Sequence, residues 1–293
     1  MVNQNEKNRN QKFGIVVGIV SFLCFALLSG FVKAVSCQGL ATEQIVFFQS
    51  VIALIVLLPW IFRQGKQAAI PKNKILIIIR SLIGLTFLYL FYTAVRHTSL
   101  VNAVLLKNTS PLFIPILMFF FFRKKLTVQI MITMMIGFLG VVLVLNPSKG
   151  FFSQGDLVAL LAGFVAALGT ITVGHLEDKG ESVSTMMLYY LAIAVVVTGI
   201  WAMPAWRNPQ GLQWLYLIFI GILYASYQVL FLTAIKYSSP VILAPFIYLG
   251  VVFSGIVDWI GWKQIPDQTT VIGAAIVVAG AIFSTIHIKK VQE

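Results

Sequence analysis

Apolar stretches of about 20 residues follow one another along the chain, and they constrain its fold more than any other feature. A helix of this length crosses the ~30 Å hydrocarbon core of a bilayer. Hydrophobic residues make up 59% of the 293 residues and charged residues 10%, whereas a soluble domain has roughly 25% charged residues. The sequence therefore predicts an all-α polytopic membrane protein.

We predict ten transmembrane helices, because short segments rich in Gly, Pro, Asn or charge separate the apolar stretches. Basic residues orient these helices, since cytoplasmic loops are enriched in Lys and Arg. With the N-terminus inside, fourteen Lys and Arg lie on the cytoplasmic side and five, among them Lys33, on the other. We therefore expect both termini in the cytoplasm and the chain in a bacterial inner membrane. The predicted helices cover residues of about 13–35, 43–62, 75–95, 99–122, 127–146, 154–176, 183–203, 212–235, 239–261 and 268–288.

A repeat at an offset of 140 residues divides the chain into two halves. The segment "FYTAVRHTSLV" (91–101) aligns with "FLTAIKYSSPV" (231–241), and the same register continues through the following spans. Each half has five spans, an odd number, so we predict that the halves are inverted relative to each other. Such repeats are typical of secondary transporters, which bind substrate between the halves. The predicted units are a tail (1–12), the first five-helix repeat (13–146), an external linker (147–153), the second repeat (154–288) and a tail (289–293).

Four motifs resemble the drug/metabolite transporter superfamily, in particular its ten-helix EamA branch. They are "IIRSLIGL" with Arg80, "FYTAVRHTS", "NTSPLFIPIL" and "APFIYL". The resemblance covers essentially the whole chain and implies a transporter of small metabolites or drugs. This chain departs from the family pattern in "FFRKKL", which lacks an acid, and at Gln49, where an Arg is common.

Several other functions find no support in the sequence. It has no P-loop, HExxH or GxSxG motif, so we expect neither ATP-driven transport nor an enzyme, and no catalytic residues. Two Cys and three His are scattered without metal-ligand spacing, so we expect no metal and no cofactor. The net charge of +12 lies in short clusters, which argues against nucleic acid as a partner. The expected partners are a small-molecule substrate and membrane lipids, and small-residue positions suit helix packing within the chain or in a homodimer.

Lys107 stands inside the predicted span 99–122, where a lysine costs about 2.5–3.5 kcal/mol at the helix centre. Two interpretations are open. In the structural one, Lys107 pairs with carbonyl groups or with an acid of another helix, such as Asp258. In the functional one, it lines a central cavity and attracts an anionic group of the substrate. Asn108 beside it, and Pro111 and Pro115, which would loosen the helix and free carbonyl groups, fit the functional interpretation.

Amide and aromatic side chains at mid-membrane depth complete the predicted site. Tyr224 and Gln228 are four residues apart and share a helix face. We expect Lys107 to hold a carboxylate or phosphate, amides to make directional hydrogen bonds, and tyrosines to contact an organic group. The alternatives are an exporter of amphipathic or cationic compounds, and a scaffold or lipid-handling protein of the same fold. The predicted substrate-binding residues are Lys107, Asn108, Gln49, Tyr89, Tyr224, Gln228 and Tyr248.

The predicted topology can be tested with reporter fusions. Fusions at Gln64 and Lys124 should report a cytoplasmic location, and fusions at Lys149 and Asn208 an external one. The reason is that an odd number of spans separates each cytoplasmic site from each external one. An external signal at Lys124 would contradict both the topology and the inverted repeat.

Overall fold

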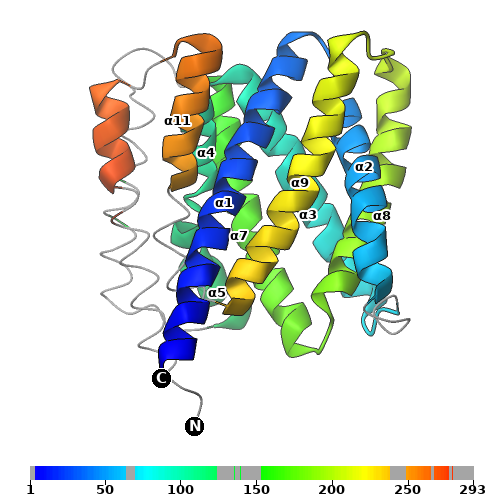
Figure 1. The fold of residues 1–293 in the computed structure, drawn as a ribbon, viewed down its shortest axis with the longest axis vertical. Coiled ribbons are helices and arrows are strands. Elements are labelled where there is room, and N and C mark those ends of the chain that lie inside the picture. The colour runs from blue at the N-terminus through cyan, green and yellow to red at the C-terminus, as the bar shows by residue number, and fades with distance from the viewer. Residues whose placement is uncertain are drawn as a thin grey trace.

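The computed structural model describes residues 4–63, 70–123, 135, 139, 153–237, 249–264, 267–276 and 279, and within them all regular secondary structure is helical. The helices stand side by side in one bundle (Figure 1). Their bounds are α1 Gln4–Cys37, α2 Thr42–Arg63, α3 Lys74–His97, α4 Leu100–Lys107, α5 Ser110–Phe122, α7 Gln154–Asp178, α8 Val183–Ala202, the 3-10 helix η3 Met203–Ala205, α9 Leu212–Tyr237 and α11 Leu249–Trp262, followed by a helical stretch at 268–276.

Seven helical segments within the described residues are long and apolar enough to cross a membrane. Many of their large apolar side chains point outward, including Ile55, Phe120 and Val196, which are 66%, 71% and 60% exposed. Lipid tails accept such a surface, whereas a soluble monomer rarely carries so much of it. Apart from positions 135 and 139, the predicted span 127–146 lies outside the described residues, as do residues 239–248 and 280–288 of the last two spans.

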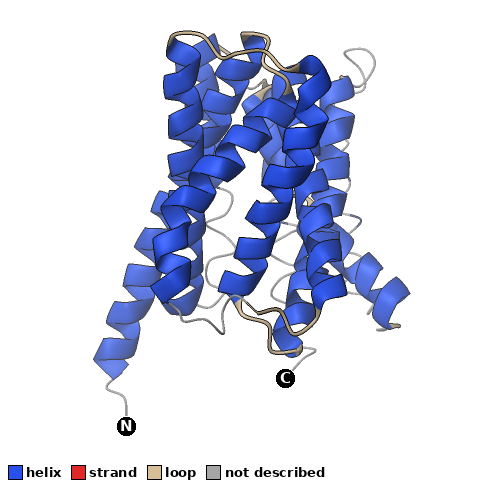
Figure 2. Cartoon of the chain, turned by 90° about the vertical axis from the view of Figure 1, so that its right-hand side faces the viewer, coloured by secondary structure: helices blue, strands red, loops and turns tan. Residues whose placement is uncertain are grey.

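Helices from the N-terminal part of the chain pack against helices from the C-terminal part. The most extensive contacts join α1 to α9, α3 to α7, and α2 to α8. Figure 2 shows the same bundle from the side, with the long helices running between its two ends. The fully buried side chains at these contacts include Leu28 of α1, Phe91 and Tyr92 of α3, and Leu191 of α8. The centre of the bundle is therefore formed jointly by both parts of the chain.

The predicted single span 99–122 is in fact two helices, α4 and α5, with a turn at Asn108–Thr109. A proline at position 111 has no N–H to donate to the carbonyl of residue 107, so one backbone hydrogen bond of a continuous helix is missing at this point. The Asn108 N–H still bonds to the Val104 carbonyl, at 3.2 Å, and closes α4. The helix is interrupted just before Pro111, where we had predicted only that the prolines loosen it, whereas Pro115 lies inside α5.

Gly163 of α7 allows the backbone to approach this break closely. A Cβ atom at position 163 would lie 2.7 Å from the Leu106 carbonyl oxygen and 2.8 Å from the Thr109 hydroxyl oxygen. Both distances are shorter than a van der Waals contact, so only glycine fits here without a shift. The non-helical turn is thus covered by protein, which is the condition for irregular backbone at membrane depth.

Asp258 of α11 ties the start of α4 to α1. Its side chain is fully buried and pairs with Lys33 of α1, with Nζ and Oδ1 2.7 Å apart. Its other oxygen accepts hydrogen bonds from the backbone N–H groups of Leu100, at 2.5 Å, and Val101, at 3.3 Å. A carboxylate at a helix N-terminus is favourable because free N–H groups and the helix dipole are positive there. One side chain therefore joins three helices.

This arrangement corrects two expectations about charges. The structural interpretation of Lys107 named Asp258 as its partner, but Asp258 is held by Lys33 and by α4. Lys33, which we had counted as an external residue, lies inside α1 and is only 5% exposed. Its ammonium also donates to Gln264 Oε1 at 3.1 Å and lies over the Trp262 ring.

The Lys33–Asp258 ion pair leads to a prediction about the melting temperatures of its variants. Asp258→Ala should lower the melting temperature strongly, because breaking a buried ion pair from one side costs about 3–5 kcal/mol. The double variant Lys33→Met/Asp258→Asn removes both charges but keeps an amide oxygen for the N–H groups of α4. We expect it to recover part of the loss in thermal unfolding of the purified protein. A double variant no more stable than Asp258→Ala would contradict the assignment.

Candidate functional site

Lys107 ends α4, and its ammonium lies between aromatic rings at the centre of the bundle. Nζ is 3.7 Å from the centroid of the Phe25 ring in α1 and 5.3 Å from that of Phe91 in α3. The last carbonyl groups of a helix are the negative end of its dipole, so a cation is favoured at this position. Lys107 thus stands at a helix terminus inside the bundle and is half-buried.

No carboxylate in the described part of the chain forms an ion pair with Lys107. A desolvated cation–π contact stabilises by about 2 kcal/mol, while a lysine at the helix centre costs about 2.5–3.5 kcal/mol. The rings therefore offset only part of the cost, and the positive charge stays uncompensated. The chemistry of such a group is suited to a carboxylate or phosphate ligand.

Gln49 of α2 lies next to this cation–aromatic cluster. Its Oε1 accepts a hydrogen bond from the Tyr92 hydroxyl, and the Tyr92 ring packs against Phe91 at 5.9 Å between centroids. The Nε2 atom of Gln49 is buried and has no hydrogen-bond partner in the described structure. Gln49 is thus linked to the cluster through Tyr92, and its unused amide donor suits a ligand that carries hydrogen-bond acceptors.

Tyr224 and Gln228 of α9 share one helix face, as predicted, and bond to each other. Gln228 Nε2 donates to the Tyr224 hydroxyl oxygen at 2.9 Å. Tyr227, on a neighbouring position of α9, lies 5.1 Å from Phe25 between ring centroids. This part of α9 therefore borders the aromatic rings that hold Lys107.

The remaining predicted site residues lie elsewhere or outside the described chain. The Tyr89 hydroxyl donates to Glu43 Oε1 at 3.3 Å, and its ring stacks on Trp201 at 4.9 Å, which joins α3 to α2 and α8. Asn108 caps the C-terminus of α4 through its backbone. Tyr248 is not among the described residues.

Arg80 of α3 is a basic residue that our predicted site omitted. It lies where α3, α8 and α9 meet, with its guanidinium carbon 5.7 Å from the centroid of the Tyr190 ring. The sequence did contain a signal for it, because Arg80 is a cation within the predicted span 75–95, near its start. We had used it only as part of a family motif.

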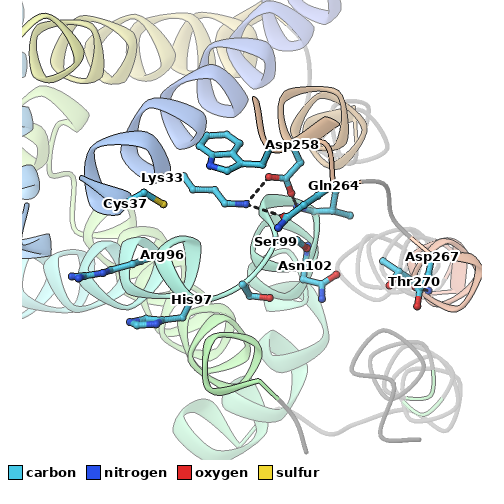
Figure 3. Close-up of a pocket in the computed structure, with 13 residues that line it drawn as sticks. Lys33, Cys37, Arg96, His97, Ser99, Asn102, Asp258, Gln264, Asp267 and Thr270 are labelled. Carbon is cyan, nitrogen blue, oxygen red and sulfur yellow. Dashed lines mark hydrogen bonds and ion pairs between the residues drawn. The ribbon is translucent and has the colours of Figure 1, made fainter. Parts of the chain in front are cut away.

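A pocket of about 620 Å³ opens at the end of the bundle where α1 and α3 end (Figure 3). The Lys33–Asp258 pair lies in its wall, with Gln264 beside it. None of the predicted site residues lines it. Among the residues described, no cluster of His, Cys, Asp and Glu could hold a metal ion.

The sequence model of the EamA-like transporter family matches residues 12–146 and, a second time, residues 153–286. The chain belongs to the EamA-like transporter family. This confirms the resemblance to the drug/metabolite transporter superfamily that the motifs indicated. The described helices of this EamA-like protein accordingly form a multi-pass membrane protein of a transporter family.

Curated relatives share about a quarter of their residues with this EamA-like chain over nearly its full length. The pseudopaline exporter CntI of Pseudomonas aeruginosa is 26% identical over 92% of this chain and 95% of its own. The S-adenosylmethionine uptake transporter of Rickettsia felis is 26% identical over 94% of each chain. The riboflavin transporter of Vibrio cholerae is 26% identical over 90% of this chain and 89% of its own. A solved crystal structure covers 98% of this chain with a TM-score of 0.58 at 16% identity, which shows a shared fold.

Lys33, which is buried, and Lys107, which is half-buried, offer a matched test of the charge assignment. Lys107→Met should melt at or above the temperature of the wild type, because no carboxylate is left without its partner. Lys33→Met should melt clearly lower, because Asp258 then keeps a buried charge without a cation. Both can be followed by tryptophan fluorescence of the purified protein during heating. If the melting temperature of Lys107→Met falls as far as that of Lys33→Met, Lys107 has a structural counter-ion.

Proposed function

We propose that this protein is a secondary transporter of a small polar metabolite that carries a carboxylate or phosphate. The observation that carries the proposal is Lys107, a cation at a helix break inside the bundle with aromatic rings but no carboxylate against it. The named relatives transport pseudopaline, S-adenosylmethionine and riboflavin. Membrane transport of a small metabolite follows from the family, and the anionic group is inferred from the site.

In the proposed binding mode the anionic group meets Lys107, and amides fix the rest of the molecule. Gln49 Nε2 is a free donor beside the cluster, and the Tyr224–Gln228 pair offers a hydroxyl and an amide from the opposite part of the chain. Asn108, Tyr89 and Tyr248 remain part of the proposed site. The Tyr89 hydroxyl would have to break its hydrogen bond with Glu43 before it could contact the substrate. Of these residues, Tyr89 is therefore the one whose contact with substrate needs a rearrangement.

We further propose that transport proceeds by alternating access between two inverted five-helix repeats in a ten-helix chain. The double match of the family model and the repeat at an offset of 140 residues support this architecture. Substrates of such transporters bind near discontinuous helices at the midplane, and the α4–α5 break beside Lys107 fits that description. We place the protein in the bacterial inner membrane with both termini in the cytoplasm.

The Lys33–Asp258 pair would then close one end of the pathway. It joins α1, from the first family match, to α11, from the second. Any rocking of one half against the other at this end has to stretch or break the pair, and with it the contact to the start of α4. The pocket in Figure 3 would be the vestibule outside this closure.

Uptake into proteoliposomes tests the proposal. Radiolabelled amino acids, sugar phosphates, nucleotides, S-adenosylmethionine and riboflavin should be screened with and without a pH gradient. Lys107→Ala should reduce uptake of the accepted anion at least about 30-fold, because losing a desolvated charge partner costs about 2–5 kcal/mol. Lys107→Arg should retain part of it, since a planar guanidinium needs a differently shaped cavity.

Lys74→Ala is the matched control, because Lys74 is an exposed lysine at the start of α3. It should transport like the wild type. Full activity of Lys107→Ala would contradict the proposed role of Lys107. Uptake restricted to cationic compounds would favour the alternative of a cation or drug exporter.

A further inference from the structure

Arg80 is held in a defined place by a glycine one turn along its own helix. A Cβ atom at position 84 would lie 2.5 Å from Arg80 Nη1 and 3.0 Å from the Tyr190 ring. Gly84 therefore leaves the space into which the guanidinium folds, between the backbone of α3 and the ring of Tyr190 in α8. An arginine that reached out to the membrane surface would not need this space.

Two of the three guanidinium nitrogens of Arg80, Nε and Nη1, are buried and have no hydrogen-bond partner in the described structure. An arginine stays charged at all pH values of interest, and a buried donor without a partner is costly. Lys33 shows how the same chain satisfies a buried cation, with the carboxylate of Asp258 and the amide of Gln264. No carboxylate among the described residues pairs with Arg80.

The surroundings of Arg80 are polar but uncharged. The hydroxyl groups of Tyr190 and Tyr224 hydrogen bond to each other, and Gln228 donates to Tyr224. These residues come from α8 and α9, in the second family match, while Arg80 is in the first. Arg80 and these polar side chains thus lie between the two parts of the chain. Transporters built of two repeats bind their substrates in such a position.

We propose that Arg80, with Tyr190 and Tyr224, is a second anion-binding site, which takes the carboxylate or phosphate of the transported metabolite at a different depth from Lys107. A guanidinium presents parallel N–H groups that match two oxygens of such an anion. The guanidinium lies beside Gly84, and along α3 Gly84 and Phe91, the residue beside Lys107, are separated by seven positions, or roughly 10 Å at 1.5 Å per residue. The two cations are therefore successive binding positions for one anionic group on its way through the bundle.

This inference rests on the proposed function only in taking the ligand to be the transported metabolite. Its test measures binding, so its failure is distinct from a failure of transport by the Lys107 variants. The probes are acetate, for the carboxylate, and inorganic phosphate, each compared with chloride at constant ionic strength. Melting of the lipid-free, detergent-purified protein is followed by tryptophan fluorescence.

We expect acetate or phosphate to raise the melting temperature of the wild type by about 2 °C or more. Because the Lys107 site should also bind these anions, the comparison is made in the Lys107→Gln background, which should keep a rise that depends on Arg80. Adding Arg80→Gln should remove that rise, yet the protein should melt in chloride at or above the temperature of Lys107→Gln, because an unpaired charge has been removed. The probe that gives the larger rise identifies the oxyanion.

Gly84→Ala provides a second variant that keeps the charge but displaces the guanidinium, and it should also lose the rise. Its matched control is Gly169→Ala in α7, where a Cβ atom would meet only Ile83 of α3, at 3.6 Å. That variant should respond to the anion like the wild type. A rise that persists when Arg80→Gln and Gly84→Ala are each combined with Lys107→Gln, or no rise in the wild type, overturns the proposal.

The phosphate at this site could also come from a lipid headgroup, and a separate experiment distinguishes a bound lipid from a free anion. The same melting curves are recorded in micelles with phosphatidylglycerol and in micelles with the uncharged detergent alone. A rise that depends on Arg80 and occurs only with phosphatidylglycerol would assign the site to a structural lipid and overturn its role in transport. A rise with the free anions in the absence of lipid supports the proposal.

Discussion

The requirement that every backbone polar group find a partner inside a bilayer determines how this chain is built. Long helices satisfy it within each segment, and the described structure contains helices alone as regular elements. The turn between α4 and α5 is the place where the helical pattern fails inside a span. It is tolerated because the Asn108 and Thr109 N–H groups still find carbonyls and because Gly163 lets α7 cover the turn. The interruption just before Pro111 is what places a helix end, and with it Lys107, inside the bundle.

Three cations inside the described part of the bundle, one buried and two half-buried, have three different environments. Lys33 has a carboxylate, an amide and an indole ring, and it joins helices that are far apart in sequence. Lys107 has two phenylalanine rings, and Arg80 has two nitrogens without a partner. Because burying a charge is costly, a cation with a full set of partners is readily explained by structure. The other two are better explained by an anion that comes and goes.

Part of the proposed site was predictable, and the rest depended on contacts between distant segments. Lys107 stood out in the sequence because a cation in an apolar span has a known cost. The Tyr224–Gln228 pair followed from helical spacing alone. The partner of Asp258 could not be predicted from helical spacing, because the choice between Lys33 and Lys107 depends on which helices lie beside α11. Arg80 was visible as a charged residue, but its unsatisfied nitrogens became apparent only when α8 and α9 were in place around it.

The sequence by itself determined that the chain is a helical membrane protein and to which transporter family it belongs. These properties follow from local apolar length and from motifs that are continuous in the chain. Only the tertiary structure decided that span 99–122 divides in two around a buried turn, that Lys33 neutralises Asp258, and that Lys107 and Arg80 have no carboxylate partner among the described residues. The physical reason is that the free energy of a buried charge depends on its neighbours in space, and here those neighbours come from helices up to 225 residues apart in the chain.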